Sequence, residues 1–151
     1  MVIKEFHNLC DDALKIRQKV FVEEQKFKDE FDEIDQRCIT LVGYIDDQPV
    51  ACSRAFFDEE EKKYKVGRFA VLKDYRKKGL GLEMLKATCQ VIKKMGGKEV
   101  WLHSQLQAEG FYKQAGFSSV GEIGYEEYCP HIWMVKKIWF LDEIRKITQN
   151  P

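Results

Sequence analysis

The sequence lacks an excess of charge of one sign, because 25 Lys and Arg residues balance 25 Asp and Glu residues. A protein whose main task is to hold a nucleic-acid backbone or an anionic membrane usually carries a strong positive excess. We therefore expect neither a nucleic acid nor a membrane as a partner. Any phosphate group that the protein binds must be held by a local group of residues.

The five cysteines lack the C-x-x-C spacing of zinc knuckles and thioredoxin-type pairs, so we expect no metal site. Long apolar runs are also absent, since no stretch reaches the ~18 residues of a membrane span. Residues 1–10 lack the basic and then apolar pattern of a secretory signal. Together these absences predict a cytoplasmic protein whose thiols are reduced and mostly buried.

Hydrophobic periodicity predicts a single α/β (α+β) domain over residues 1–151. Apolar residues at helical spacing indicate helices over 9–24, 82–95, 105–115 and, as an addition to the domain, 139–150. Alternating or β-branched runs indicate strands over 1–6, 38–45, 49–57, 64–72, 98–104, 117–123 and 131–138. We expect Asn8 to cap the first helix, Gly67 to permit a bulge, and the acidic segment 29–35 to be a solvated loop.

The tail helix has an apolar face that needs a partner. Its apolar residues lie on one side of the helix and are Trp139, Phe140, Ile144 and Ile147. That face can pack on its own sheet, or on a second copy of the chain to form a homodimer. An interaction protein that uses this helix is one of the alternatives to an enzyme.

A basic, glycine-rich turn is the strongest chemical feature. It joins the strand 64–72 to the helix 82–95 and reads Arg76, Lys77, Lys78, Gly79, Leu80 and Gly81. Unpaired backbone N–H groups at a helix start, small glycines and local positive charge together favour a diphosphate. No Lys-Ser or Lys-Thr pair follows the glycines, which disfavours an NTPase. Met84 stands where a dinucleotide fingerprint needs Gly or Ala.

This turn resembles the R-x-x-G-x-G motif of the GNAT N-acetyltransferase superfamily. A second stretch, Gln105-x-x-Ala108-x-x-x-Tyr112-x-x-x-Gly116-Phe117, is similar to another motif of that family, with Gln105 where Asn is usual. The segments VFVEEQ and YEEYCPHIWM look like the small bacterial ElaA-like branch. The resemblance covers roughly residues 3 to 138, with both motifs in the family's order.

The resemblance implies a mixed, splayed central sheet of about six or seven strands flanked by helices. Acetyl-CoA would enter where the fourth and fifth strands part, with its pyrophosphate on the turn from Arg76 to Gly81. The coenzyme-binding residues would be Phe69, Ala70, Val71, Arg76, Lys77, Lys78, Gly79, Leu80, Gly81 and Gln105. An extended pantetheine arm can add to an exposed strand edge, which agrees with this placement.

Tyr112 stands where the family often has its general acid, and a phenol suits that role. The alternative is an aromatic residue that only packs above the sheet. Many relatives have a glutamate base near the position of Arg68. Candidates for a base or for the acceptor pocket are Glu24, Glu127 and His131. We expect His103, near the end of its strand, to be a core or rim histidine rather than a base.

These features predict an N-acetyltransferase that moves an acetyl group from acetyl-CoA to a primary amine of a small molecule or peptide. The amine would attack directly in a ternary complex, without a metal. Because no acidic residue stands at Arg68, an acyl-CoA-binding regulatory module without turnover is the alternative.

Overall fold

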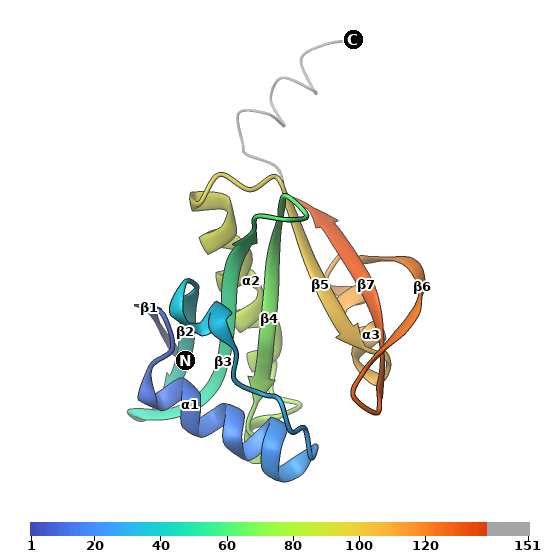
Figure 1. Cartoon of the computed structure of the whole chain (residues 1–151). Coiled ribbons are helices and arrows are strands. Elements are labelled where there is room, and N and C mark those ends of the chain that lie inside the picture. Colours follow the sequence, from blue (N-terminus) through green and yellow to red (C-terminus); the bar gives the residue numbers. More distant parts are fainter. Residues whose placement is uncertain (139–151) are drawn as a thin grey trace.

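The computed structural model describes residues 1–138 (Figure 1). The expected helix at 139–150 and its apolar face lie outside the described residues. Within residues 1–138, seven strands form one mixed sheet in the order β1-β2-β3-β4-β5-β7-β6. They are β1 (Val2–His7), β2 (Ile39–Ile45), β3 (Gln48–Asp58), β4 (Lys63–Val71), β5 (Glu99–Gln105), β6 (Ser118–Glu126) and β7 (Cys129–Lys137). Only β4 and β5 run parallel, and the expected mixed α/β architecture is confirmed.

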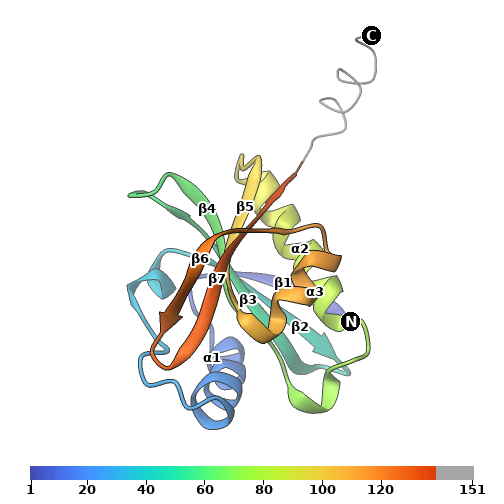
Figure 2. The same cartoon turned by 90° about the vertical axis from the view of Figure 1, so that its right-hand side faces the viewer.

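The helices cover both faces of the sheet. They are α1 (Asp11–Arg17), the π-helical turns η1 (Gln18–Glu24), α2 (Leu80–Lys94) and α3 (Glu109–Gln114), with short 3-10 turns η2 (Glu33–Gln36), η3 (Lys73–Tyr75) and η4 (Leu106–Ala108). α1 lies against one face, whereas α2 lies against the other (Figures 1 and 2). Each face has its own apolar core, with Ala13 and Ile16 on the α1 side and Met84 and Ile92 on the α2 side.

The start of the first helix differs from expectation. Cys10 is the residue that precedes α1, and no side chain caps the helix there. Asn8 has φ +67° and donates its backbone N–H to the carbonyl of Cys38, so it extends the β1–β2 ladder. The predicted Asn8 cap is wrong, because the backbone of Asn8 pairs with Cys38 and the residue therefore belongs to the end of the strand pairing.

The sheet opens between β4 and β5. Their pairing is limited to Lys65 with Trp101 and Val66 with Leu102, and beyond these residues the two strands diverge (Figure 1). The splay expected from the family resemblance is therefore present.

A bulge bends β4 at the point where it leaves β5. The register of β3 against β4 shifts between Cys52 and Arg54, which places two β4 residues, Arg68 and Phe69, opposite one β3 residue. Arg68 takes a left-handed conformation with φ +46°, next to the Gly67 that predicted a bulge. The bend directs the end of β4 away from β5.

The acidic segment 29–35 is only in part the solvated loop that its charge pattern predicts, since Asp29 and Glu33 are exposed. Glu30 and Asp35 are buried, because Arg17 from α1 reaches both carboxylates at 2.9 and 2.6 Å. Two further arginines complete the cluster: Arg54 contacts Asp35 at 3.0 Å, and Arg68 contacts Glu30 at 3.1 Å. The segment is thereby held against the sheet face that α1 covers.

Candidate active site

The basic turn stands at the open end of β4, between η3 and α2. Gly79 adopts φ +80° as the residue before α2, a conformation that glycine takes without the steric cost of a Cβ. Gly81 lies in the first turn of α2, and a Cβ placed there would be 3.3 Å from the Phe111 ring. The first backbone N–H groups of a helix have no intrahelical acceptor. The turn therefore presents unpaired donors beside a position kept small.

The side chains of the turn divide into two groups. Lys77 and Lys78 are exposed, whereas the Leu80 side chain is buried in the core below α2. Leu80 can therefore offer a ligand only its backbone. The lysines can offer positive charge to an anion at the mouth of the turn.

Arg76 braces the turn against two other elements. Its Nη1 and Nη2 lie 2.8 and 2.9 Å from the two carboxylate oxygens of Glu24 at the end of η1. Its Nε donates to the carbonyl oxygen of Val71 at 2.8 Å. The hydrogen bonds from Arg76 lower the pKa of Glu24, so this carboxylate is ionised and paired rather than poised to accept a proton.

The edge of β4 faces the gap at Val71. The backbone N–H of Leu72 donates to Val50 of β3 at 2.9 Å. Because successive residues of a strand present their backbone groups to opposite sides, Val71 directs its own toward the gap, where its carbonyl oxygen already accepts from Arg76 and its N–H can face a ligand. Across the gap, Gln105 ends β5 and donates to the Gln25 side chain at 2.7 Å.

Tyr112 lies on α3, packed beside the bulge. It is only 8% exposed, and its ring meets the rings of Phe69 and Phe117 at centroid distances of 6.1 and 5.9 Å. Burial raises the pKa of its phenol, which keeps the hydroxyl protonated at neutral pH. The residue expected to act as an acid therefore packs against Phe69, one of the residues expected along the coenzyme.

Glu127 lies in the β6–β7 connection and binds the backbone of the segment that follows η1. Its carboxylate accepts the backbone N–H groups of Lys28 and Asp29 at 3.0 and 3.1 Å. This carboxylate ties the connection to the segment that follows η1.

His131 lies buried on β7, and its Nδ1 is 2.9 Å from the carbonyl oxygen of Cys129. A carbonyl oxygen only accepts, so Nδ1 must carry the hydrogen. Its other nitrogen, Nε2, is 3.3 Å from Oε2 of Glu126 on β6.

His103 makes a contact that its place in the sequence did not indicate. Its Nδ1 lies 2.7 Å from Oε1 of Glu126, and its ring stacks on Trp133 at 4.4 Å. Burial of Glu126 opposes its ionisation, but the hydrogen bond with His103 and the nearby His131 outweigh burial and lower the pKa of this carboxyl. The sequence shows that His103, His131 and Glu126 are present. Their side chains come into contact only through the register of β5, β6 and β7.

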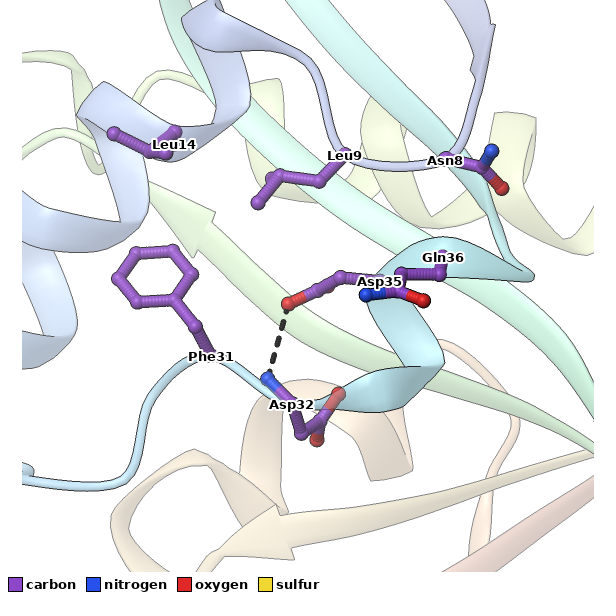
Figure 3. Close-up of a pocket in the computed structure, with 7 residues that line it drawn as sticks. All are labelled: Asn8, Leu9, Leu14, Phe31, Asp32, Asp35 and Gln36. Carbon is purple, nitrogen blue, oxygen red and sulfur yellow. Dashed lines mark hydrogen bonds between the residues drawn. The ribbon is translucent and has the colours of Figure 1, made fainter.

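A surface pocket lies away from the gap, beside the start of α1 (Figure 3). It is lined by Asn8, Leu9, Leu14, Phe31, Asp32, Asp35 and Gln36. In this pocket the backbone N–H of Asp32 donates to the Asp35 carboxylate at 3.2 Å (Figure 3). No residue of the basic turn reaches it, so we do not assign the coenzyme to this pocket.

Two negative findings apply to residues 1–138. In this part of the chain, no group of three or more His, Cys, Asp or Glu side chains could hold a metal ion. None of the helices described there is long and apolar enough to cross a membrane.

Comparisons with known proteins converge on one family. The model of the acetyltransferase (GNAT) family matches residues 6–117. The uncharacterized protein YyaT of Bacillus subtilis is 36% identical over 132 residues, which are 84% of this chain and 88% of YyaT. The crystal structure of Escherichia coli ElaA matches with a TM-score of 0.80 and 25% identity, over 90% of this chain and 99% of that chain.

The fold also matches a structure whose title names a ligand. A crystal structure of an aminoglycoside 6'-N-acetyltransferase complexed with coenzyme A gives a TM-score of 0.74 at 17% identity. The match covers 93% of this chain and 98% of that chain. At this identity the likeness concerns the fold.

Proposed function

This chain belongs to the GNAT family of acetyltransferases, and we propose that it moves an acetyl group from acetyl-CoA to a primary amine of a small molecule or peptide. The observation that carries the proposal is the basic turn that follows the open end of β4, where this strand no longer pairs with β5. The turn offers a site for a diphosphate, and the parted strands offer a backbone edge beside it.

The residues around the gap suit a coenzyme A molecule. Its pyrophosphate would meet the backbone of Gly79, Leu80 and Gly81 and the charges of Lys77 and Lys78. Arg76 would act mainly through its contacts, because its guanidinium already joins Glu24 to the end of β4. Glu24 would accordingly serve as a brace for the turn and not as a base.

The pantetheine arm would follow the open edge of β4 past Phe69, Ala70 and Val71. Val71 supports this path because its backbone N–H faces the gap. Gln105 would close the gap from the β5 side, where Gln25 orients its amide. A flexible amide chain paired with a strand edge gains hydrogen bonds without requiring a deep pocket.

Acetyl-CoA would supply the acetyl group as a thioester, which a neutral amine can attack directly in a ternary complex. As the C–S bond breaks, Tyr112 would donate its phenolic proton to the departing sulfur and the attacking nitrogen would lose a proton to solvent. Solvent would then return a proton to Tyr112. Two features support this role: the buried phenol is protonated at neutral pH, and its ring contacts Phe69 of the proposed arm site.

The test is the release of free CoA from acetyl-CoA with a panel of primary amines. The panel contains sugar amines, polyamines, amino acids and peptides with a free N-terminus, and a thiol reagent measures CoA. We expect release that depends on the presence of one class of amine, with the acetylated product identified by mass. CoA binding without release on any amine would instead support the regulatory module, in which Arg68 replaces the acidic residue of many relatives.

A further inference from the structure

Three ionisable side chains gather on one sheet face beside the gap, each from a different strand. His103 comes from β5, Glu126 from β6 and His131 from β7. His103 follows Leu102, the last β5 residue that pairs with β4, so it stands where the sheet opens. The two imidazole rings are 4.8 Å apart and share one carboxylate.

The shared carboxylate determines which nitrogen of His103 carries a hydrogen. Glu126 is ionised and can only accept, so the Nδ1 atom at 2.7 Å must be the donor. In the neutral ring the lone pair then resides on Nε2. No hydrogen bond within residues 1–138 engages that atom. A neutral imidazole with its tautomer fixed by a carboxylate is the arrangement that a general base requires.

Exposure separates the two histidines. The His131 side chain is 4% exposed and its Nδ1 is held by the Cys129 carbonyl. His103 is 17% exposed, and the Glu126 carboxylate beside it is 45% exposed. An acceptor can therefore approach His103 and Glu126 from solvent, whereas His131 can only support Glu126 from below.

The remaining charges around His103 already have partners. Its ring stacks on Trp133, above which Lys65 of β4 lies 4.7 Å from the ring centroid. Lys65 is paired with Asp58 at 2.8 Å and with Glu61 at 3.0 Å. Arg68, at the bulge of β4, is paired with Glu30 and Asp32. Within the described residues, Glu126 is the carboxylate that contacts His103 directly.

We propose that His103 is the general base for the acceptor, and that Glu126 is the residue that positions it. This inference rests on the proposed function and names the acceptor class as an amine that arrives as an ammonium ion, which the exposed carboxylate attracts. An N–H bond of the ammonium breaks, the proton moves to Nε2 of His103, and the electron pair stays on the nitrogen, which then attacks the acetyl carbon. The nitrogen next loses a second proton to solvent as the C–S bond breaks, and the sulfur leaves with that bond's electron pair and takes the proton of Tyr112. His103 passes its proton to solvent before the next turnover.

The proposal predicts the pH profile of kcat/KM. A base must be unprotonated to act, so kcat/KM rises with pH along an acidic limb. His103→Gln removes the base and should lower kcat/KM about 100-fold, with the limb lost. Glu126→Gln keeps an acceptor oxygen but removes the charge that stabilises the imidazolium. This variant should therefore lower kcat/KM by less than His103→Gln does.

The control variant is His7→Gln, on the exposed end of β1, which should keep the wild-type profile. Calorimetry with CoA should give the same affinity for all variants, which separates loss of the base from loss of the coenzyme site. An active enzyme whose limb survives His103→Gln, or whose limb is lost in His131→Gln alone, would overturn the proposal while the proposed function stands.

A second readout does not depend on finding the acceptor. The ¹⁵N chemical shifts of the histidine side chains distinguish the two neutral tautomers, and His103→Gln assigns the resonances. We expect the hydrogen of neutral His103 on Nδ1 in the wild type, and on a mixture of both nitrogens in Glu126→Gln. A hydrogen on Nε2 in the wild type would overturn the proposal, even if every amine of the panel fails and the proposed function falls as well.

Discussion

Replacing Arg17 with methionine should destabilise the protein strongly, because it leaves two buried carboxylates with too few partners. Arg17 is 2% exposed and donates to Glu30 at 2.9 Å, to the Glu30 carbonyl at 2.9 Å, and to Asp35 at 2.6 and 3.1 Å. Methionine has a similar length and no charge, so the change removes four hydrogen bonds without opening a large cavity.

Removing one partner of a buried ion pair costs about 3–5 kcal/mol. Here Arg54 still contacts Asp35 and Arg68 still contacts Glu30, so we expect a loss of about 3 kcal/mol. A typical domain has a free energy of unfolding of about 5–15 kcal/mol, so this loss is a large fraction of the total.

The loss should also depend on pH. Burial of Asp35 opposes ionisation, but its contacts with Arg17 outweigh burial and lower the pKa of the carboxyl in the folded state. A depressed pKa stabilises the fold above the unfolded pKa of about 3.9 and stops doing so as pH falls through the folded pKa. The difference between wild type and Arg17→Met should therefore be largest near neutral pH and shrink below about pH 4.

Urea denaturation followed by tryptophan fluorescence measures this difference. With a slope of about 2 kcal/mol per molar urea, the midpoint should fall by about 1.5 M. The control is Lys15→Met, an exposed position on the same helix, which should change the free energy of unfolding by less than about 0.5 kcal/mol. A loss below about 1 kcal/mol in Arg17→Met, or one that is equal at pH 7 and at about pH 3, would refute the reasoning.

Three further outcomes follow from the contacts of single residues. Tyr112→Phe should lower kcat about 100-fold and leave CoA affinity unchanged, because it removes a proton donor and keeps the ring, and steady-state kinetics with calorimetry checks this. Arg76→Ala should weaken CoA binding by about 1.5–3 kcal/mol, since the turn loses its brace to Glu24 and Val71; unchanged calorimetric affinity would count against it. Burial raises the pKa of the Cys52 thiol to about 12, so iodoacetamide should modify it only after unfolding, as mass spectrometry can show.

The sequence predicted the parts of the fold that depend on local pattern. Apolar spacing located α2 within two residues at either end, because Gly79 and Gly96 punctuate it. The bulge beside Gly67 was also anticipated, although the residue that takes the left-handed conformation is Arg68. A tertiary contact explains this exchange, since the Arg68 guanidinium is held by Glu30 from a distant segment.

Long-range pairing of charged groups could not be predicted. The acidic segment 29–35 reads as solvated, and only the fold brings Arg17, Arg54 and Arg68 to it. The same limit applies to the site, where Arg76 meets Glu24 across 52 positions of sequence. The sequence shows which side chains are charged, whereas the ion pairs that they form depend on how the strands and helices are arranged.

The hydrogen bond between His103 and Glu126 is another contact that the sequence alone could not predict. The place of His103 near the end of β5 predicts a rim histidine, whereas the structure places Glu126, 23 residues later in the sequence, 2.7 Å from the His103 Nδ1. One-residue changes in the register of β6 would turn Glu126 to the other sheet face. The role of His103 is therefore set by strand pairing rather than by motif.

Calorimetric titration of coenzyme A into wild type and Gly81→Leu tests the coenzyme site most directly. A Cβ at position 81 would lie 3.3 Å from the Phe111 ring, so a leucine side chain would crowd the start of α2 beside the turn. Circular dichroism and thermal unfolding first verify that the variant is folded. We expect one CoA bound per wild-type chain and at least tenfold weaker binding in folded Gly81→Leu, since phosphate can no longer approach the backbone. Wild-type protein that does not bind CoA, or equal affinity in the two proteins, would contradict the assignment of the turn.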